Sequence, residues 1–440
     1  MDDPENLNIA IIGGGYAGMA AAVKLAERGI AVTVFESARQ LGGRARGVEY
    51  QNLQLDNGQH LLLGCYQQTL KLIEQVGGNL TEDFLRLPLQ LDLHGHFKLK
   101  SAHLPAPLHL FIALLRAQGI NWTERYQAVR LMVHLRQIKF SLTQDMTAIN
   151  FLNLEGQSPA LIQKLWEPLC IAALNTPVRI ASAQVLLNVL RDALNQTRAD
   201  SDMLIPRINF SALFPERAAH YIKKRGAHVL TSCGVSALDV LNDGVKITTK
   251  RGQLFYSHVI CATQATSAAK LLHPVSGLTR VLTQIDALTH QPIYTLYLQY
   301  PPFVTLPQPM LGLHQRMSQW LFDQGQISGK AGLIACVISA AGIHQNLSQD
   351  ALANAVIDEL AEEFGLIVRP RWFKVIAEKR ATFACTANLL RPSQQTPLPR
   401  VLLAGDYTRG DYPATLEGAV QSGIMCAQLI GVTSAERYLQ

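Results

Sequence analysis

The 440-residue chain is poor in charge, which narrows the classes of protein it can belong to. Charged residues make up 16% of it, against about 25% in an ordinary soluble domain. Hydrophobic residues reach 48%, so the low charge indicates a large interior or a surface that meets something apolar. The 39 basic residues exceed the 33 acidic ones, but they look too evenly spread to indicate nucleic-acid binding. The excess fits a mild attraction to anionic lipid headgroups.

Cysteines are few and give no sign of a structural role. The seven cysteines are odd in number and widely spaced, and no CxxC pair occurs. This pattern excludes a disulfide framework and a cysteine zinc site, and it indicates reduced thiols in a cytoplasmic protein. The start, MDDPENLN, lacks the basic and apolar regions of a secretory signal, and no run approaches the roughly 20 apolar residues that span a bilayer. The histidines of HGH at 94–96 lack a third ligand, so no metal site is expected.

The first 36 residues contain the most informative pattern of the sequence. An apolar run at 7–12 predicts a buried strand, a glycine turn at 13–18 follows it, and an alanine-rich stretch predicts a helix. A second apolar strand then ends at an acid, Glu36. This order is typical of a dinucleotide site, in which the acid accepts hydrogen bonds from ribose hydroxyls and the start of the helix holds the diphosphate. The predicted contacts are Gly13, Gly15, Tyr16, Ala17, Gly18 and Glu36.

Two further segments extend this site. In the loop LGGRAR at 41–46, Gly43 can lie beside the pyrophosphate and Arg44 can pair with a phosphate. NAD dehydrogenases do not usually carry this loop.

Near the C-terminus, VLLAG predicts a buried strand, which ends at Gly405 and Asp406, and a helix is expected over 414–430. Asp406 is placed to accept from the hydroxyls of a ribityl chain, and the helix beginning near Thr415 and Leu416 would aim N–H groups at a flavin ring. Glu417 is either part of that contact or a simple capping acid.

These three segments together resemble the FAD-dependent amine-oxidase and carotenoid-desaturase superfamily. Further stretches, LDNGQHLLLGCY at 55–66, the segment 166–194 and DMLIPRINFSALFPERAAHYI at 202–222, are similar to the hydroxysqualene dehydroxylase family within it. The resemblance covers nearly the whole chain. It implies that FAD is the cofactor.

The resemblance also implies site residues. The turn at 56–60 passes beside the isoalloxazine ring, which makes Gly58, Gln59 and His60 candidate flavin contacts. Val235 is expected to contact the adenine through its backbone, although an ordinary core valine is nearly as good an interpretation. His60 is a candidate proton donor because its unperturbed pKa lies near neutrality, with a satisfied core histidine as the alternative. Asp411 and Tyr412 either face the cavity beside the flavin ring or belong to an ordinary loop.

The implied fold class is α/β. A doubly wound, Rossmann-like FAD-binding domain with the GxGxxG turn is interleaved with a mixed-sheet and helical substrate domain. The FAD-binding parts are 1–85, 206–275 and 391–440, and the substrate parts are 86–205, largely helical, and 276–390.

The implied reaction is the reductive dehydroxylation of hydroxysqualene to squalene in squalene and hopanoid biosynthesis, with hydride passing from reduced flavin N5 to an allylic cation. The partners are an apolar C30 isoprenoid substrate and an unidentified electron donor. Cavity tyrosines such as Tyr294 or Tyr297 could support the cation. One rival is a carotenoid-type desaturase or amine oxidase of the same fold, and another is a non-catalytic prenyl-lipid carrier.

The apolar stretch at 103–118 has two interpretations. It predicts either a buried helix or a helix face that dips into a bilayer. The second would make the protein a peripheral membrane protein on the cytoplasmic face.

Overall fold

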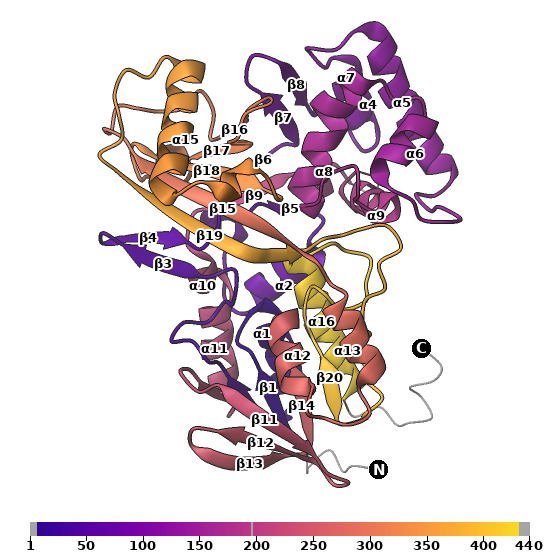
Figure 1. Ribbon diagram of the computed structural model, residues 1–440, viewed down its shortest axis with the longest axis vertical. Coiled ribbons are helices and arrows are strands. Elements are labelled where there is room, and N and C mark those ends of the chain that lie inside the picture. Colours follow the sequence, from indigo (N-terminus) through magenta and orange to yellow (C-terminus); the bar gives the residue numbers. More distant parts are fainter. Residues whose placement is uncertain (1–6, 195–196, 431–440) are drawn as a thin grey trace.

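The computed structural model describes residues 7–194 and 197–430, and a parallel sheet lies in the lower half of the molecule in Figure 1. Its order is β10-β2-β1-β14-β20, and every neighbouring pair is parallel. Its strands are β1 (Asn8–Ile12), β2 (Ala31–Phe35), β10 (His228–Leu230), β14 (His258–Cys261) and β20 (Val401–Leu403). Strands β1, β2, β14 and β20 are almost entirely buried, as expected for short apolar strands covered on both faces, whereas β10 at one edge is only partly buried. The predicted parallel sheet is therefore confirmed, and both ends of the chain contribute to it.

Helices from both ends of the chain pack side by side on this sheet. Gly423 of α16 (Leu416–Leu429) lies so close to α1 (Tyr16–Glu27) that a Cβ there would come within 2.1 Å of the Ala17 carbonyl oxygen. The other helices of this part are α2 (Gln67–Gln75), α3 (Leu80–Asp83), α10 (Phe210–Leu213), α11 (Pro215–Lys223), α12 (Ala265–Leu272) and α13 (Thr279–Asp286). All seven cysteines are unpaired and buried.

Smaller sheets surround the parallel one. An antiparallel sheet at the foot of Figure 1 contains β11 (Val235–Val240), β12 (Val245–Thr249) and β13 (Gly252–Tyr256). A hairpin joins β3 (Gly47–Tyr50) to β4 (Leu53–Asp56), and β9 (Met203–Pro206) lies between β5 (Leu62–Leu63) and β6 (Phe84–Leu87).

A mixed sheet of seven strands forms the upper left of Figure 1. Its order is β19-β15-β18-β17-β16-β7-β8, and only the β16–β7 pair is parallel. Its strands are β7 (Gln90–Leu93), β8 (Phe97–Lys100), β15 (His290–Gln299), β16 (Met310–Gly312), β17 (Trp320–Asp323), β18 (Leu333–Ser339) and β19 (Trp372–Phe383). One face packs against α15 (Gln349–Phe364) through a separate apolar core, and α14 (Gln324–Ser328) follows β17.

Helices gather at the upper right of Figure 1. They are α4 (Leu108–Leu115), α5 (Trp122–Gln137), α6 (Ala148–Leu154), α7 (Pro159–Leu161), α8 (Glu167–Leu174) and α9 (Ala183–Leu194), with a π-helical turn at Ile162–Trp166. The largely helical segment expected over 86–205 thus contains these helices, but its start, β7 and β8, joins the mixed sheet. The last residues of this segment belong to β9, which pairs with β5 and β6. No helix in the described ranges has the length and apolar character to cross a bilayer.

Candidate active site

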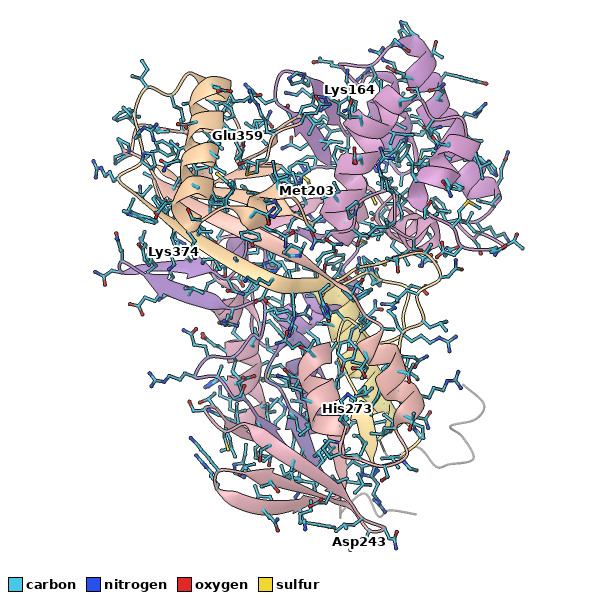
Figure 2. The ribbon with its side chains drawn as sticks, viewed as in Figure 1. Lys164, Met203, Asp243, His273, Glu359 and Lys374 are labelled. Atoms are coloured by element: carbon cyan, nitrogen blue, oxygen red, sulfur yellow. The ribbon has the colours of Figure 1, made fainter. Side chains whose placement is uncertain are left out.

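A cavity of about 750 Å³ runs from the edge of the parallel sheet to the space between the mixed sheet and the helices. Its two ends differ in chemistry. The lower end is lined by the glycine turn, Glu36 and the loop after β2, while the upper end is lined mainly by apolar side chains, among them Leu110, Leu114, Met132, Leu165, Leu190 and Val337. Met203, which also lines the cavity, lies near the centre of the molecule in Figure 2. One continuous space therefore joins a polar cradle to an apolar chamber.

The glycine turn has the geometry of a diphosphate cradle. Gly13 has φ +113°, and a Cβ there would lie 2.5 Å from the Ala262 carbonyl oxygen, so only glycine fits this turn. A Cβ on Gly18 would lie 2.0 Å from the Gly13 carbonyl oxygen, which shows how closely α1 packs on the strand. Gly15 differs, because its Cβ would make only ordinary van der Waals contact, with the Gly43 Cα at 3.8 Å. Gly15 and Gly43 both line the cavity.

Glu36 lies at the end of β2 and lines the same end of the cavity. Its carboxylate accepts a hydrogen bond from the Gly14 N–H at 2.7 Å and another from the Ala38 N–H at 2.7 Å, with the Ser37 hydroxyl at 3.1 Å. Because a carboxylate has about four acceptor positions, it can still accept from a ribose hydroxyl. Val235 lines this end too, as the adenine contact requires.

We expect the Glu36→Gln variant to bind FAD about tenfold more weakly than the parent while the fold remains intact, since a hydrogen bond to a charged acceptor is replaced by one to an amide. Titration of the apo-protein with FAD, followed by fluorescence quenching, measures the dissociation constant. The matched control is Asp243→Asn, which removes one carboxylate from the exposed turn between β11 and β12, labelled in Figure 2. Equal FAD affinity of the Glu36 variant and this control would remove Glu36 from the site.

The glycine-arginine loop ties the two ends of the chain together. The Gly42 N–H donates to the Gly14 carbonyl oxygen at 2.9 Å. Arg44 lines the cavity, and its guanidinium donates to Asp406 Oδ1 at 2.6 Å and to the Ala381 carbonyl oxygen at 2.6 Å. A phosphate contact by Arg44 stays a prediction, since the guanidinium is already held by Asp406. The ion pair nevertheless places the C-terminal segment beside the N-terminal cradle.

The start of α16 faces the cavity. Gly405, Asp406, Thr415 and Leu416 all line it, and the Thr415 hydroxyl caps the helix by accepting from the Gly418 N–H at 3.1 Å. The N–H groups of the first turn and the helix dipole favour negative charge there.

Glu417 lies at the same helix start but points elsewhere. It is 1% exposed and does not line the cavity. Its carboxylate accepts from the backbone N–H groups of Gln68 and Thr69 and from the Thr69 hydroxyl, so it stabilises the start of α2. Of the two interpretations of Glu417, the structure thus favours the capping acid over the contact with the flavin.

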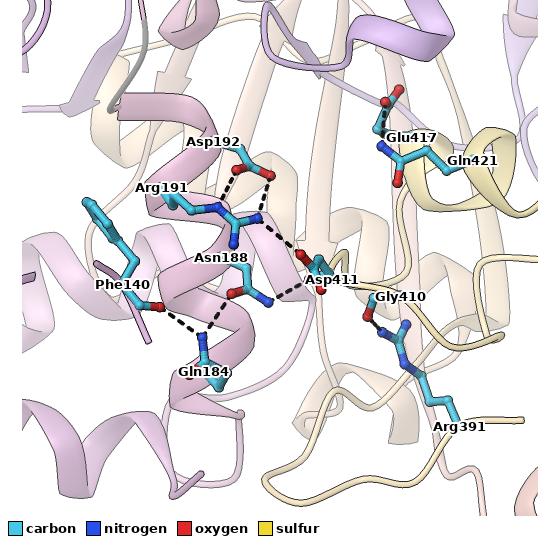
Figure 3. Close-up of polar contacts among 10 residues, drawn as sticks. All are labelled: Phe140, Gln184, Asn188, Arg191, Asp192, Arg391, Gly410, Asp411, Glu417 and Gln421. Carbon is cyan, nitrogen blue, oxygen red and sulfur yellow. Dashed lines mark hydrogen bonds and ion pairs between the residues drawn. The ribbon is translucent and has the colours of Figure 1, made fainter. Parts of the chain in front are cut away.

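Asp411 and Tyr412 are not among the cavity-lining residues. Figure 3 shows Arg191 of α9 between Asp192 and Asp411, and the Asp411 carboxylate is 3.2 Å from the Arg191 guanidinium and 66% exposed. Tyr412 packs its ring edge-on against Tyr66. Both residues therefore hold the loop after β20 against its neighbours, and the structure does not bring them to the cavity.

The tyrosines considered as cation partners also lie outside the cavity lining. Tyr297 donates its hydroxyl to the Asp56 carbonyl oxygen at 3.1 Å, and Tyr294 packs into the core beneath α15. Alternation along β15 turns Tyr294 to the face opposite the cavity, which Ile293 lines, whereas Tyr297 shares the face of Ile293 but has its hydroxyl held at the Asp56 backbone.

Gly58, Gln59 and His60 do line the cavity. The His60 Nδ1 lies 2.6 Å from the Gly58 carbonyl oxygen, which selects the tautomer protonated on Nδ1. Burial lowers the pKa of His60 and the Arg44 guanidinium lowers it further, although the Gly58 carbonyl opposes them. The imidazole is therefore neutral at pH 7, which makes it a poor proton donor.

The structure brings three residues to the cavity that the sequence interpretation missed. Asn175, which ends α8 in the left-handed region at φ +46°, donates to Thr382 Oγ1 at 2.9 Å and accepts from the Ala340 N–H at 2.7 Å. Glu378 and Thr382 come from β19, whose register shifts against β15 between them. Three consecutive charged residues, at 378–380, were the sequence feature that could have indicated this part of the site. Such a run inside a predicted strand is typical of a bulge, and bulges are common next to active sites.

The cradle fits FAD. Gly13, Gly15 and Gly43 line the cavity where the diphosphate would bind, Glu36 and Val235 lie where the adenosine would sit, and Asp406 and the α16 start lie toward the ring end. All of the predicted FAD contacts line this one cavity except Gly18, which packs α1, and Glu417.

Comparison with known proteins agrees with this geometry. The family model for flavin containing amine oxidoreductases matches residues 16–431. The hydroxysqualene dehydroxylase of Rhodopseudomonas palustris is 30% identical, with 96% of this chain and 98% of that protein covered. The zeta-carotene desaturase of Arabidopsis thaliana is 24% identical, over 96% of this chain and 85% of that protein. Among solved structures, the cyclohexylamine oxidase of Brevibacterium oxydans superimposes with a TM-score of 0.72 at 16% identity, covering 99% of this chain and 100% of that one. The chain thus belongs to the flavin-containing amine oxidoreductase family, and it is an FAD-dependent oxidoreductase.

Proposed function

We propose that this protein converts hydroxysqualene to squalene by reductive dehydroxylation. The observation that carries the proposal is the apolar chamber that opens directly from the FAD cradle, lined by leucines and methionines of α4, α5, α9 and the mixed sheet. A C30 isoprenoid alcohol needs such a chamber, and the full-length similarity to a hydroxysqualene dehydroxylase supports this choice among apolar substrates.

The reaction requires a hydride, a proton and an environment without water. Reduced FAD, when bound, supplies the hydride. The chain must therefore orient the allylic carbon, exclude water from the substrate cation, and protonate the leaving hydroxyl so that it departs as water. The balance is one alcohol, one hydride and one proton in, and one squalene and one water out. Each turnover consumes two electrons, so an external electron donor is also required.

We propose Glu378 as the proton donor. Three carboxylates line the cavity, and two of them have clear partners, since Glu36 accepts from the glycine turn and Asp406 pairs with Arg44. The nearest donors to Glu378 are the Asn57 amide and the Arg380 N–H, both at 3.4 Å. Its carboxyl oxygens are therefore less engaged by the protein than those of Glu36 and Asp406.

The Thr382 hydroxyl would assist, because it also lines the cavity. Its oxygen accepts from Asn175, so its own proton is free to donate toward the departing oxygen. Asn175 thus acts as a positioning residue that fixes the Thr382 rotamer.

We expect Glu378→Gln to lower kcat about 100-fold, the lower range for loss of a general acid, while FAD content stays at the parent level. Single-turnover kinetics with pre-reduced enzyme measure the rate. The control is Glu49→Gln on the exposed hairpin of β3 and β4. A rate for Glu378→Gln equal to that of the control would exclude this carboxyl as the acid.

The proposal is tested by product analysis. Purified protein with reductant should convert hydroxysqualene to squalene, whereas zeta-carotene and primary amines should leave the oxidised flavin unreduced. Flavin reduction by zeta-carotene would favour a desaturase, as the similarity to the Arabidopsis enzyme allows. Lack of bound, reducible flavin would favour a lipid carrier.

A substrate of this class resides in lipid, so we also propose peripheral contact with a membrane. In this proposal, the helices that line the chamber make the contact with the membrane.

A further inference from the structure

The helical part carries an apolar surface that no described segment covers. On α4 the outward side chains are Leu108, Phe111, Ile112 and Leu115, and on α5 they are Trp122, Tyr126, Val129 and Val133. Five of these are clearly exposed: Leu108 at 53%, Leu115 at 39%, Trp122 at 71%, Tyr126 at 66% and Val133 at 43%.

The two sets form one surface, which we call the α4–α5 face. On α5 the residues recur every three to four positions and so share one side of the helix. The two helices pack against each other, and the Arg136 guanidinium of α5 lies 5.6 Å from the centre of the Phe111 ring of α4. Figure 1 shows α5 at the outer edge of the helical part, with α4 beside it. Contiguous exposed apolar side chains of this kind mark an interaction site.

The charge around this face is strongly one-sided. Between residues 94 and 144 there are seven lysines and arginines and one acidic residue, a net charge of +6 that equals the net charge of the whole chain. The expectation that the basic residues are evenly spread along the chain is therefore wrong, because the excess is concentrated in this segment. The single acid, Glu124, is buried in the capping box at the start of α5, so it does not offset the cations at the surface.

The cations flank the apolar side chains. Arg125 lies over the Trp122 ring, with 4.5 Å between the guanidinium carbon and the ring centre. Arg116 follows Leu115 at the end of α4, and Lys139 lies just after α5; both are exposed. An exposed tryptophan and tyrosine beside leucines, bordered by lysine and arginine, is the composition of a helix surface that lies in the headgroup region of an anionic bilayer.

We infer that the α4–α5 face binds the surface of an anionic lipid bilayer. Other sides of the same two helices line the cavity, through Leu110 and Leu114 of α4 and Met132 of α5. A single layer of helix therefore separates the bilayer from the apolar chamber. This geometry would let an apolar chain pass from lipid to flavin without crossing water, a step that rests on the proposed function, whereas the lipid binding itself does not.

Vesicle flotation in the absence of substrate tests the inference with the full-length holoenzyme. We expect the protein to bind vesicles of phosphatidylglycerol and phosphatidylcholine in equal parts, and to bind phosphatidylcholine alone at least about tenfold more weakly. The double variant Trp122→Ser/Tyr126→Ser should lower the partition coefficient about tenfold. The double variant Arg116→Gln/Lys139→Gln should remove most of the preference for the anionic lipid.

The matched control is Phe303→Ser/Ile367→Ser, which removes two apolar side chains exposed at 74% and 98% on loops of the mixed-sheet part. Its partitioning should equal that of the parent. Equal partitioning of the Trp122/Tyr126 variant and this control would overturn the inference. So would a parent dimer, seen by sedimentation velocity, that the Trp122/Tyr126 substitutions dissociate without any vesicle binding, since the face would then join two copies of the chain.

Discussion

The Gly15→Val variant should be purified colourless, without bound flavin, and correctly folded. A Cβ at this position meets no atom closer than 3.8 Å, and the residue has φ −80°, so the backbone tolerates a side chain. The valine methyl groups would instead project toward the cavity that Gly15 and Gly43 line, where the diphosphate would bind. We therefore expect loss of FAD binding by more than about 1000-fold, because the close approach of the backbone to the ligand is blocked.

The absorption spectrum of the purified protein and its circular dichroism together check this result. Gly410→Val is the matched control, since Gly410 also has open space around its Cβ position but lies outside the cavity lining. The control should keep its yellow colour. Full flavin content in the Gly15 variant would show that the diphosphate does not use this turn.

The Ala173→Trp variant should show the opposite behaviour, keeping its flavin and losing turnover. Ala173 of α8 lines the cavity above the cradle, between the helices and the mixed sheet. An indole there occupies the space proposed for the substrate, and misplacing the reacting carbon by an ångström is enough to cost about 100-fold in rate. We expect conversion of hydroxysqualene to fall by about 1000-fold, to background.

Flavin content, thermal melting and the rate of squalene formation are measured on the same preparation. Ala351→Trp on the exposed surface of α15 is the control for adding an indole to a helix, and it should be fully active. If the Ala173 variant turned over at the control rate, the chamber beside α8 would not hold the substrate.

The cofactor half of the molecule could be predicted because its signals are local. Gly13, Gly18 and Glu36 lie within one strand-turn-helix-strand unit, and the sequence order alone determines where their backbones meet. The C-terminal strand and helix carry the same kind of local pattern, and the parallel sheet brings them to the same edge. The resemblance to a known family supplied the turn at 58–60, which spacing alone does not reveal.

The reacting end could not be predicted in the same way, because it is assembled from distant segments. Asn175 at the end of a helix reaches Thr382 on a strand more than 200 residues later, and only the tertiary fold shows that contact. Asp411 and Tyr412 were chosen for closeness in sequence to Asp406, yet the loop turns them toward α9. Tyr297 was chosen for its aromatic ring, but its hydroxyl is bound to the Asp56 carbonyl oxygen and the residue does not line the cavity.

The most direct test of the whole account is an anaerobic titration of the photoreduced holoenzyme with hydroxysqualene. We predict that one equivalent of the alcohol restores the spectrum of oxidised FAD and yields one equivalent of squalene, with deuterium from flavin N5 on the product carbon. A flavin that stays reduced while the alcohol is recovered unchanged would contradict the proposal that this cavity delivers hydride to an isoprenoid.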